Sequence, residues 1–270
     1  MCIIVYKKPN VAPPSKAVLE RQFDNNPHGC GYMWVQDDIV RVKKGFMKFE
    51  DFYKDYQETL KVIGDKEPMI FHFRISTQAG VCPEFTHPFP LTDRRDAMTW
   101  LNYKCPVGIA HNGVISLTSS SYAKDYTDTT KFINEYLTLI LKSNDVSKIT
   151  EKQKLLIAKL INSSRLAFFD KYKNVCLIGN FIEDSKTGLV FSNTTYDIDK
   201  NKPAVSITTP RQTPLKTAVA KAKYKCCKDE KTNIYYFMPD KFCPALDNCW
   251  GYCSHCAYRG DCVYARNKKK

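Results

Sequence analysis

Apolar periodicity is regular up to about residue 193 and then decays, and this feature limits the possible folds more than any other. Two kinds of segment alternate within that part. Strand-like composition or alternation marks residues 3–6, 31–35, 39–42, 69–76, 107–110, 166–169, 175–178 and 189–191. Helical spacing or helix-start signals mark residues 15–23, 52–63, 129–141 and 152–161. Because strands come early and late with helices between them, the sequence predicts a layered α+β fold.

The remainder of the chain differs in composition. Residues 199–225 are rich in Lys, Thr and Pro and are interpreted as a linker. Residues 226–270 hold many Cys and Tyr residues and end in a run of basic residues. We therefore expect a folded domain over residues 2–198, a linker over 199–225, and a small Cys-rich, basic unit over 226–270.

Composition and charge restrict the class of protein. No apolar run approaches the roughly 18 residues of a membrane span, and the N-terminal segment lacks the features of a secretory signal. We therefore expect a cytoplasmic protein without a membrane partner, whose 12 cysteines are free, catalytic or metal-bound. The net charge is +13, and residues 205–270 hold 13 Lys and Arg against 5 Asp and Glu. This surplus is compatible with a polyanionic partner and equally with a plain solubility feature.

Cys2 is the first candidate for chemistry. Its side chain is small enough for an aminopeptidase to remove Met1 and expose it as the N-terminal residue. A free N-terminal cysteine carries a nucleophile and a base together, because its α-amine has a pKa of about 8 and accepts the thiol proton. Without further evidence, Cys2 could be a structural residue, a small side chain packed in the first strand.

Several short motifs follow Cys2 in a fixed order. They are Asn26 to Gly31, His72-Phe73-Arg74 with Ser76-Thr77, His87-Pro88-Phe89, His111-Asn112-Gly113, and Thr127-Asp128-Thr129. Together with Cys2 they resemble the signature of class II glutamine amidotransferases, which belong to the N-terminal-nucleophile (Ntn) hydrolases. The resemblance covers residues 2–195. It implies a four-layer αββα sandwich of the Ntn-hydrolase type, with the small Cys-rich unit attached at the C-terminus.

The resemblance also implies roles for individual residues. Cys2 would attack the substrate, and the Asn112 amide and the Gly113 N–H would form the oxyanion hole. Arg74 would bind the α-carboxylate of glutamine through its guanidinium fork, since that group pairs with carboxylates in bidentate fashion. Asp128 would bind the α-ammonium group.

Thr77 would hold the substrate through its backbone or hydroxyl. Read without the resemblance, Arg74 could form a structural ion pair, and Asn112-Gly113 could be an ordinary turn. Asp128 could be an N-cap or a first-turn acid of a helix, and this role is compatible with substrate binding. His72 and His111 are expected to be structural, since the α-amine already supplies a base.

Two positions depart from the family pattern. His28 stands where the family often has Asp, which puts the geometry of that loop in doubt. Residues 78–80 replace the usual His-Gly after the Thr and predict a longer substrate loop. Neither departure removes a proposed catalytic group.

The implied function is hydrolysis of the glutamine side-chain amide through a Cys2 thioester. The reaction needs no cofactor for catalysis. Roughly 70 residues follow the domain, which is too few for a synthase domain. We therefore expect a separate ammonia-accepting synthase or transferase as partner, and the alternative is a stand-alone γ-glutamyl amide hydrolase.

The C-terminal unit holds a second candidate site. Four thiolates close a tetrahedral structural zinc site, and the first choice of ligands is Cys249, Cys253, Cys256 and Cys262. Cys226, Cys227 or Cys243 could replace one of them. An iron–sulfur cluster uses the same ligand type and is the less favoured alternative. Unliganded or disulfide-paired cysteines are the third interpretation.

A function of another class also fits the C-terminal unit. The basic tail, with Trp250, Tyr252 and Tyr258 beside a zinc knuckle, would bind nucleic acid while the first domain serves as a degenerate hydrolase scaffold. Cys2 separates the two hypotheses, because a degenerate domain has little reason to keep it together with Arg74, Asn112 and Asp128.

Overall fold

The computed structural model describes residues 2–76, 80–117, 127–197, 226–228 and 235–237. The chain divides into two compact units, Met1–Ala204 and Val205–Lys270. The first unit contains a seven-stranded and a four-stranded sheet whose neighbouring strands pair antiparallel. The predicted α+β class is confirmed.

The seven-stranded sheet has the order β10-β11-β1-β4-β2-β3-β6. Its strands are β1 (Ile3–Lys7), β2 (Cys30–Gln36), β3 (Ile39–Phe46), β4 (Met69–Phe73), β6 (Asn102–Cys105), β10 (Ile182–Glu183) and β11 (Val190–Phe191). The first strand of the chain thus lies inside the sheet, paired on one side with β4 and on the other with β11. This placement surrounds residue 2 with the ends of neighbouring strands.

The four-stranded sheet has the order β5-β7-β8-β9. Its strands are β5 (Phe89–Pro90), β7 (Val107–Asn112), β8 (Arg165–Asp170) and β9 (Val175–Ile178). A buried cluster that includes Ile4, Met33 and Ile70 of the large sheet with Ala110 and Phe169 of the small sheet packs the two sheets against each other.

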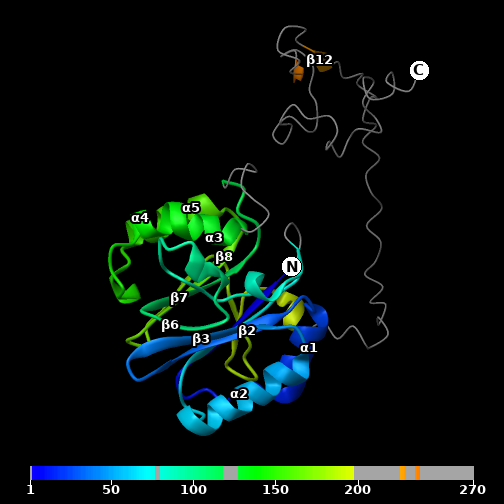
Figure 1. The fold of residues 1–270 in the computed structure, drawn as a ribbon, viewed down its shortest axis with the longest axis vertical. Coiled ribbons are helices and arrows are strands. Elements are labelled where there is room, and N and C mark those ends of the chain that lie inside the picture. The colour runs from blue at the N-terminus through cyan, green and yellow to red at the C-terminus, as the bar shows by residue number, and fades with distance from the viewer. Residues whose placement is uncertain (1, 77–79, 118–126, 198–225, 229–234, 238–270) are drawn as a thin grey trace, which may run out of the picture. The chain divides into compact units, whose positions relative to one another are not determined.

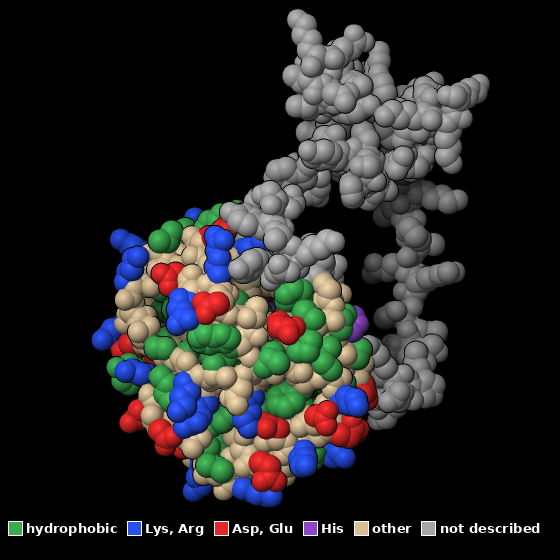
Figure 2. Space-filling view, viewed as in Figure 1, with side chains coloured by type: hydrophobic (Ala, Val, Ile, Leu, Met, Phe, Trp, Pro, Cys, Tyr) green, Lys and Arg blue, Asp and Glu red, His purple; other side chains and the backbone are tan. Residues whose placement is uncertain are grey.

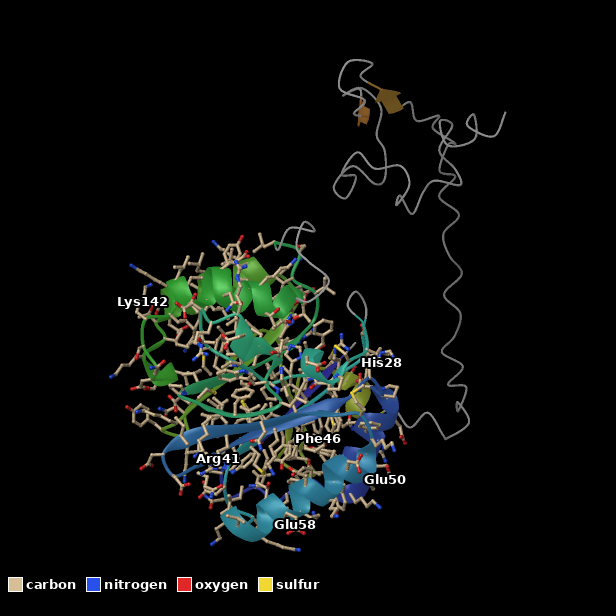
Figure 3. The ribbon with its side chains drawn as sticks, viewed as in Figure 1. His28, Arg41, Phe46, Glu50, Glu58 and Lys142 are labelled. Carbon is tan, nitrogen blue, oxygen red and sulfur yellow. The ribbon has the colours of Figure 1, made fainter. Side chains whose placement is uncertain are left out.

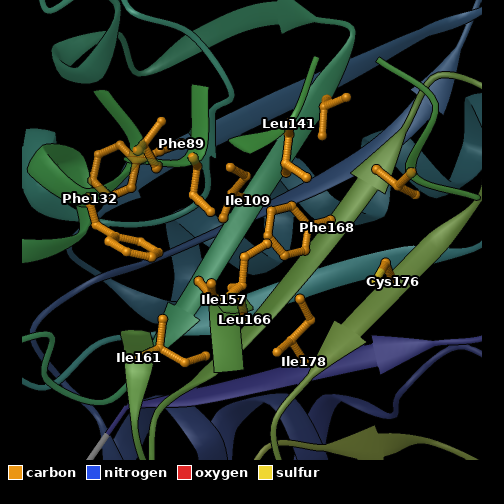
Figure 4. Close-up of a cluster of buried hydrophobic side chains, with 14 of the residues drawn as sticks. Phe89, Ile109, Phe132, Leu141, Ile157, Ile161, Leu166, Phe168, Cys176 and Ile178 are labelled. Carbon is orange, nitrogen blue, oxygen red and sulfur yellow. The ribbon is translucent and has the colours of Figure 1, made fainter. Parts of the chain in front are cut away.

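Helices cover the outer face of each sheet (Figure 1). The helices α1 (Lys16–Asn25) and α2 (Phe49–Ile63) pack on the large sheet through an aromatic cluster centred on Tyr32, Phe52 and Phe71. The helices α3 (Asp128–Phe132), α4 (Thr138–Ile140) and α5 (Glu151–Ile161) lie on the other side. The cluster under them joins residues such as Phe132 and Ile157 to Ile109 and Phe168 of the small sheet (Figure 4).

Five short helical segments complete the described part of the first unit. They are η1 (Pro83–Phe85), η2 (Asp96–Thr99), the π-helical η3 (Ile133–Leu137), η4 (Val146–Lys148) and η5 (Thr194–Asp197). The helix predicted over 129–141 is therefore not uniform, because η3 lies between α3 and α4. Apolar spacing of four residues, as between buried Ile133 and Leu137, fits an α-turn and a π-turn equally well.

The strand predicted over 69–76 is shorter than expected, since β4 ends at Phe73. Beyond it the Arg74 N–H donates to Gly29 O and the His28 N–H donates to Arg74 O. Gly29 has a φ of 98°, a left-handed conformation that ends the regular ladder. Arg74 is consequently held by a loop rather than by a strand.

In the second unit, β12 (Cys226–Lys228) pairs antiparallel with β13 (Tyr235–Phe237). The predicted linker over 199–225 and the four proposed zinc ligands lie outside the described residues. Within the described ranges, no three His, Cys, Asp or Glu side chains come together as a metal site. No helix of the described ranges has both the length and the apolar character needed to cross a bilayer.

Candidate functional site

Cys2 lies at the start of β1, beside the segment that follows β4. Its Sγ is 3.4 Å from both the backbone N and the backbone O of Ile75. Burial raises the pKa of the Cys2 thiol, while the Ile75 N–H and the positive charge of Arg74 act in the opposite direction. The resting group is therefore a thiol, and it needs a base before it can act as a nucleophile.

Arg74 is buried next to this thiol and is only partly paired. Its Nη2 donates to Ser76 Oγ at 3.2 Å, and the guanidinium stands 6.0 Å from the centre of the Phe85 ring. Nη1 is buried without a hydrogen-bond partner among the described residues. Burial lowers the pKa of Arg74, and the nearby Cys2, Cys82 and Asp128 oppose this shift. A buried guanidinium with an unused donor is well suited to an anionic ligand.

Asn112 is the last residue of β7 and is fully buried. Its Nδ2 donates to Ser192 Oγ at 2.8 Å, and one hydrogen of that amide nitrogen remains for another acceptor. Gly113 follows with a φ of 144°, and a Cβ there would lie 2.1 Å from Ser164 Oγ. Only glycine fits at this position. The pair is therefore a specialised strand end rather than an ordinary turn.

Asp128 is the first residue of α3, where Thr127 and Thr130 form a capping box. Its Oδ2 accepts from the Ile115 N–H at 2.7 Å and its Oδ1 accepts from the Thr129 N–H at 2.8 Å. Thr127 is the N-cap, so of the two structural roles considered for Asp128 the structure shows that of a first-turn acid and not that of a cap. The Thr129 hydroxyl also donates to Oδ1, at 3.4 Å. A carboxylate has about four lone-pair positions, so these three bonds leave room for a cationic ligand.

Two residues that the sequence did not single out connect these groups. Ser192 Oγ accepts from the Ile4 N–H at 2.9 Å as well as from Asn112. Asn193 Nδ2 donates to the Cys2 carbonyl oxygen at 2.8 Å. A Ser-Asn pair after a short strand carries no recognisable motif, and its partners are far away in the sequence.

Three histidines form a buried group behind the site. The rings of His72 and His87 are 4.2 Å apart, and both His87 and His111 lie within hydrogen-bond distance of Thr129 Oγ1, at 3.3 and 2.7 Å. Burial lowers the pKa of His72 to about 3 and that of His111 to about 4. Burial also lowers the pKa of His87. Neutral, buried rings fit the structural role expected for His72 and His111.

The loop that departs from the family pattern is held by the departing residue itself. His28 Nδ1 accepts from the Ser76 N–H at 2.8 Å. An imidazole nitrogen thus fixes the backbone two residues after Arg74. In Figure 3, His28 lies at the rim of the unit, beside the ends of α1 and β2.

The structure brings Cys2, Arg74, Asn112, Gly113 and Asp128 into one region. Arg74 interacts electrostatically with Cys2 and Asp128, and the Ser192-Asn193 pair connects Cys2 to Asn112. Thr77 and residues 78–79 lie outside the described residues.

The surface of the first unit gives no sign of a single charged patch on the face that Figure 2 shows. Basic and acidic side chains alternate there with scattered hydrophobic ones. Comparison of the chain with protein-family models and with curated proteins finds no match.

Proposed function

We propose that the protein hydrolyses the side-chain amide of glutamine through a thioester on Cys2 and releases ammonia for an acceptor held by a separate partner. The observation that carries the proposal is the buried Arg74, which lies in the same region as the Cys2 thiol and whose Nη1 has no hydrogen-bond partner among the described residues. A thiol alone fits many reactions. A thiol beside a buried and only partly paired guanidinium favours a substrate that has both an electrophilic carbon and a carboxylate.

Glutamine meets both requirements. Its α-carboxylate would pair with Arg74, and its α-ammonium group would pair with Asp128, whose charge already acts on Arg74. These two contacts fix one end of the amino acid and leave the side-chain amide to reach Cys2. Specificity then comes from the opposite charges at the α-carbon.

Because burial raises the pKa of the Cys2 thiol, a base must remove its proton before the sulfur can attack the substrate. Once Met1 has been removed, the α-amine of the same residue accepts the thiol proton, and the thiolate attacks the amide carbon. The free hydrogen of Asn112 Nδ2 and the Gly113 N–H stabilise the tetrahedral oxyanion. The protonated amine then gives its proton to the leaving nitrogen, which departs as ammonia.

Water completes the reaction. It attacks the γ-glutamyl thioester, the α-amine takes one of its protons, and glutamate leaves as the thiol is restored. Ammonia is lost to bulk water unless an acceptor is close, so the proposed partner is a synthase or transferase on another chain. The stand-alone hydrolase differs only in lacking that partner.

The arrangement of layers supports the same proposal. Helices, a large sheet, a small sheet and helices follow one another, and the nucleophile stands at the start of a central strand. We interpret this as the αββα sandwich of Ntn hydrolases. A structural zinc on Cys249, Cys253, Cys256 and Cys262 remains part of the proposal for the second unit.

The test is the formation of glutamate and ammonia from glutamine by the purified full chain. Cys2→Ala should abolish both products. Cys82→Ala is the matched control, because Cys82 also interacts with Arg74 but has no role in the mechanism. Glutaminamide, which lacks the α-carboxylate, should be a poor substrate. Equal turnover by wild type and Cys2→Ala would eliminate the proposal.

A further inference from the structure

The Ser192-Asn193 pair joins two groups that come from different sheets. Cys2 precedes β1 of the seven-stranded sheet, whereas Asn112 ends β7 of the four-stranded sheet. A nucleophile and an oxyanion donor work together only if their separation is fixed within a fraction of an ångström. Packing of apolar side chains between the sheets does not define the direction of an amide N–H.

Ser192 is itself held at two points. Its N–H donates to Ile4 O at 3.0 Å, and its Oγ accepts from the Ile4 N–H at 2.9 Å. The side chain is fully buried, so water does not compete for these bonds. Ser192 is therefore fixed to Ile4 of β1, which lies two residues after Cys2.

From that fixed point Ser192 Oγ receives one hydrogen of Asn112 Nδ2, at 2.8 Å. The two hydrogens of an amide nitrogen lie in one plane about 120° apart, so binding the first one sets the direction of the second. The second hydrogen is the proposed oxyanion donor. Rotation of the Asn112 amide would break the bond to Ser192.

Asn193 fixes the backbone of Cys2, the other member of the catalytic pair. Its Nδ2 donates to the Cys2 carbonyl oxygen at 2.8 Å, while its Oδ1 accepts from the backbone N and the hydroxyl of Thr195 at 2.9 and 2.6 Å. The amide of Asn193 is thus oriented by η5 and holds the backbone of the nucleophilic residue.

We propose that Ser192 and Asn193 are positioning residues: Ser192 aims the oxyanion-binding N–H of Asn112, and Asn193 holds the main chain of Cys2 in register with it. The proposal rests on the proposed glutamine hydrolysis. Neither residue touches the substrate. Both act through the geometry of the groups that do.

The test is steady-state hydrolysis of glutamine by the full chain carrying Ser192→Ala. Without the Ser192 hydroxyl the Asn112 N–H is no longer directed at the oxyanion, so kcat should fall by about 10- to 100-fold. KM should change little, because the substrate contacts at Arg74 and Asp128 are intact. The alkylation rate of Cys2 by iodoacetamide should stay at the wild-type value. Ser192→Thr, which keeps the hydroxyl, should recover most of the activity.

The combination with Asn112→Ala separates positioning from general damage. If Ser192 acts through Asn112, the double variant should be no slower than Asn112→Ala alone. Thr59→Val is the matched control, since it removes another buried hydroxyl bond, that of Thr59 Oγ1 with the Tyr32 hydroxyl at 2.8 Å. It should reduce thermal stability and leave kcat unchanged.

Each outcome decides the inference. Wild-type kcat in Ser192→Ala, or effects of Ser192→Ala and Asn112→Ala that multiply, would overturn it. If Ser192→Ala fails to fold, Ser192→Cys replaces it with the same expectation, because a thiol keeps the volume and bonds weakly. An inactive wild type would remove the proposed function and this inference with it. An active wild type with an equally active Ser192→Ala would remove the inference alone.

Discussion

Acid should destabilise the first unit through its buried histidines, and His72 allows the effect to be worked out. The ring is fully buried and its Nε2 donates to the backbone oxygen of His111 at 2.9 Å. Burial lowers its pKa from 6.5 to about 3. In the unfolded chain the ring takes up a proton below about pH 6.5, whereas in the fold it stays neutral down to about pH 3.

The sign and the size of the stability change follow from the difference between the pKa values of the folded and the unfolded chain. Between the two pKa values only the unfolded chain binds the proton. The free energy of unfolding is therefore highest above pH 6.5 and decreases as the pH falls towards 3. Each pH unit in this window removes about 1.4 kcal/mol per histidine. Between pH 7 and pH 5, His72 should therefore cost about 2 kcal/mol of the free energy of unfolding. His111, whose pKa is lowered to about 4, should cost a similar amount.

The assay is urea unfolding at pH 7 and pH 5 for the wild type and His72→Gln. Glutamine reproduces the donor at the Nε2 position and does not titrate, so the loss of stability between the two pH values should shrink by about 2 kcal/mol. Thr59→Val provides the control, because it should be less stable at both pH values but should lose as much unfolding free energy between pH 7 and pH 5 as the wild type does. An undiminished loss in His72→Gln would refute the claim that this ring stays neutral in the fold.

Three further predictions concern single features. Gly113→Ala should lower the free energy of unfolding by about 2 to 4 kcal/mol and abolish glutamine hydrolysis, because its Cβ would meet Ser164 Oγ at 2.1 Å; unfolding curves and a turnover assay check this. Arg74→Lys should raise KM for glutamine by about 10- to 100-fold with a smaller change in kcat, since a single ammonium cannot form the forked contact, and an unchanged KM would contradict the carboxylate assignment. The full chain should contain one zinc per molecule by elemental analysis, and Cys256→Ser should reduce that content; a metal-free wild type would argue against the site.

The sequence was informative where one residue type has few uses. Cys2 is a candidate from its own chemistry, Arg74 and Asp128 are expected from the resemblance, and the structure brings the three into one region. Gly113 was chosen from the resemblance, and the close approach of Ser164 now gives a physical reason for it. Apolar patterns likewise predicted most strands, because a strand buried on both faces, such as β4 or β7, gives a nearly continuous apolar run, and a half-buried one, such as β3, gives alternation.

Other features depend on contacts that no local pattern reports. Ser192 finds its partner Asn112 80 positions away, and Asn193 finds Cys2 191 positions away. The strands β5 and β6 were not predicted, because β5 is a Phe-Pro pair in which proline is no strand signal and β6 buries only two of its four residues. His28 was regarded as a departure, yet its ring accepts the Ser76 N–H that orders the loop.

The most direct test of the central claim compares two forms of the same chain, one that begins at Cys2 and one that keeps Met1, with the N-terminus of each verified by mass spectrometry. Glutamine turnover per chain is the quantity measured. The account predicts turnover only in the form that begins at Cys2, because the α-amine that accepts the thiol proton exists only there. Equal turnover in the form that keeps Met1 would contradict it.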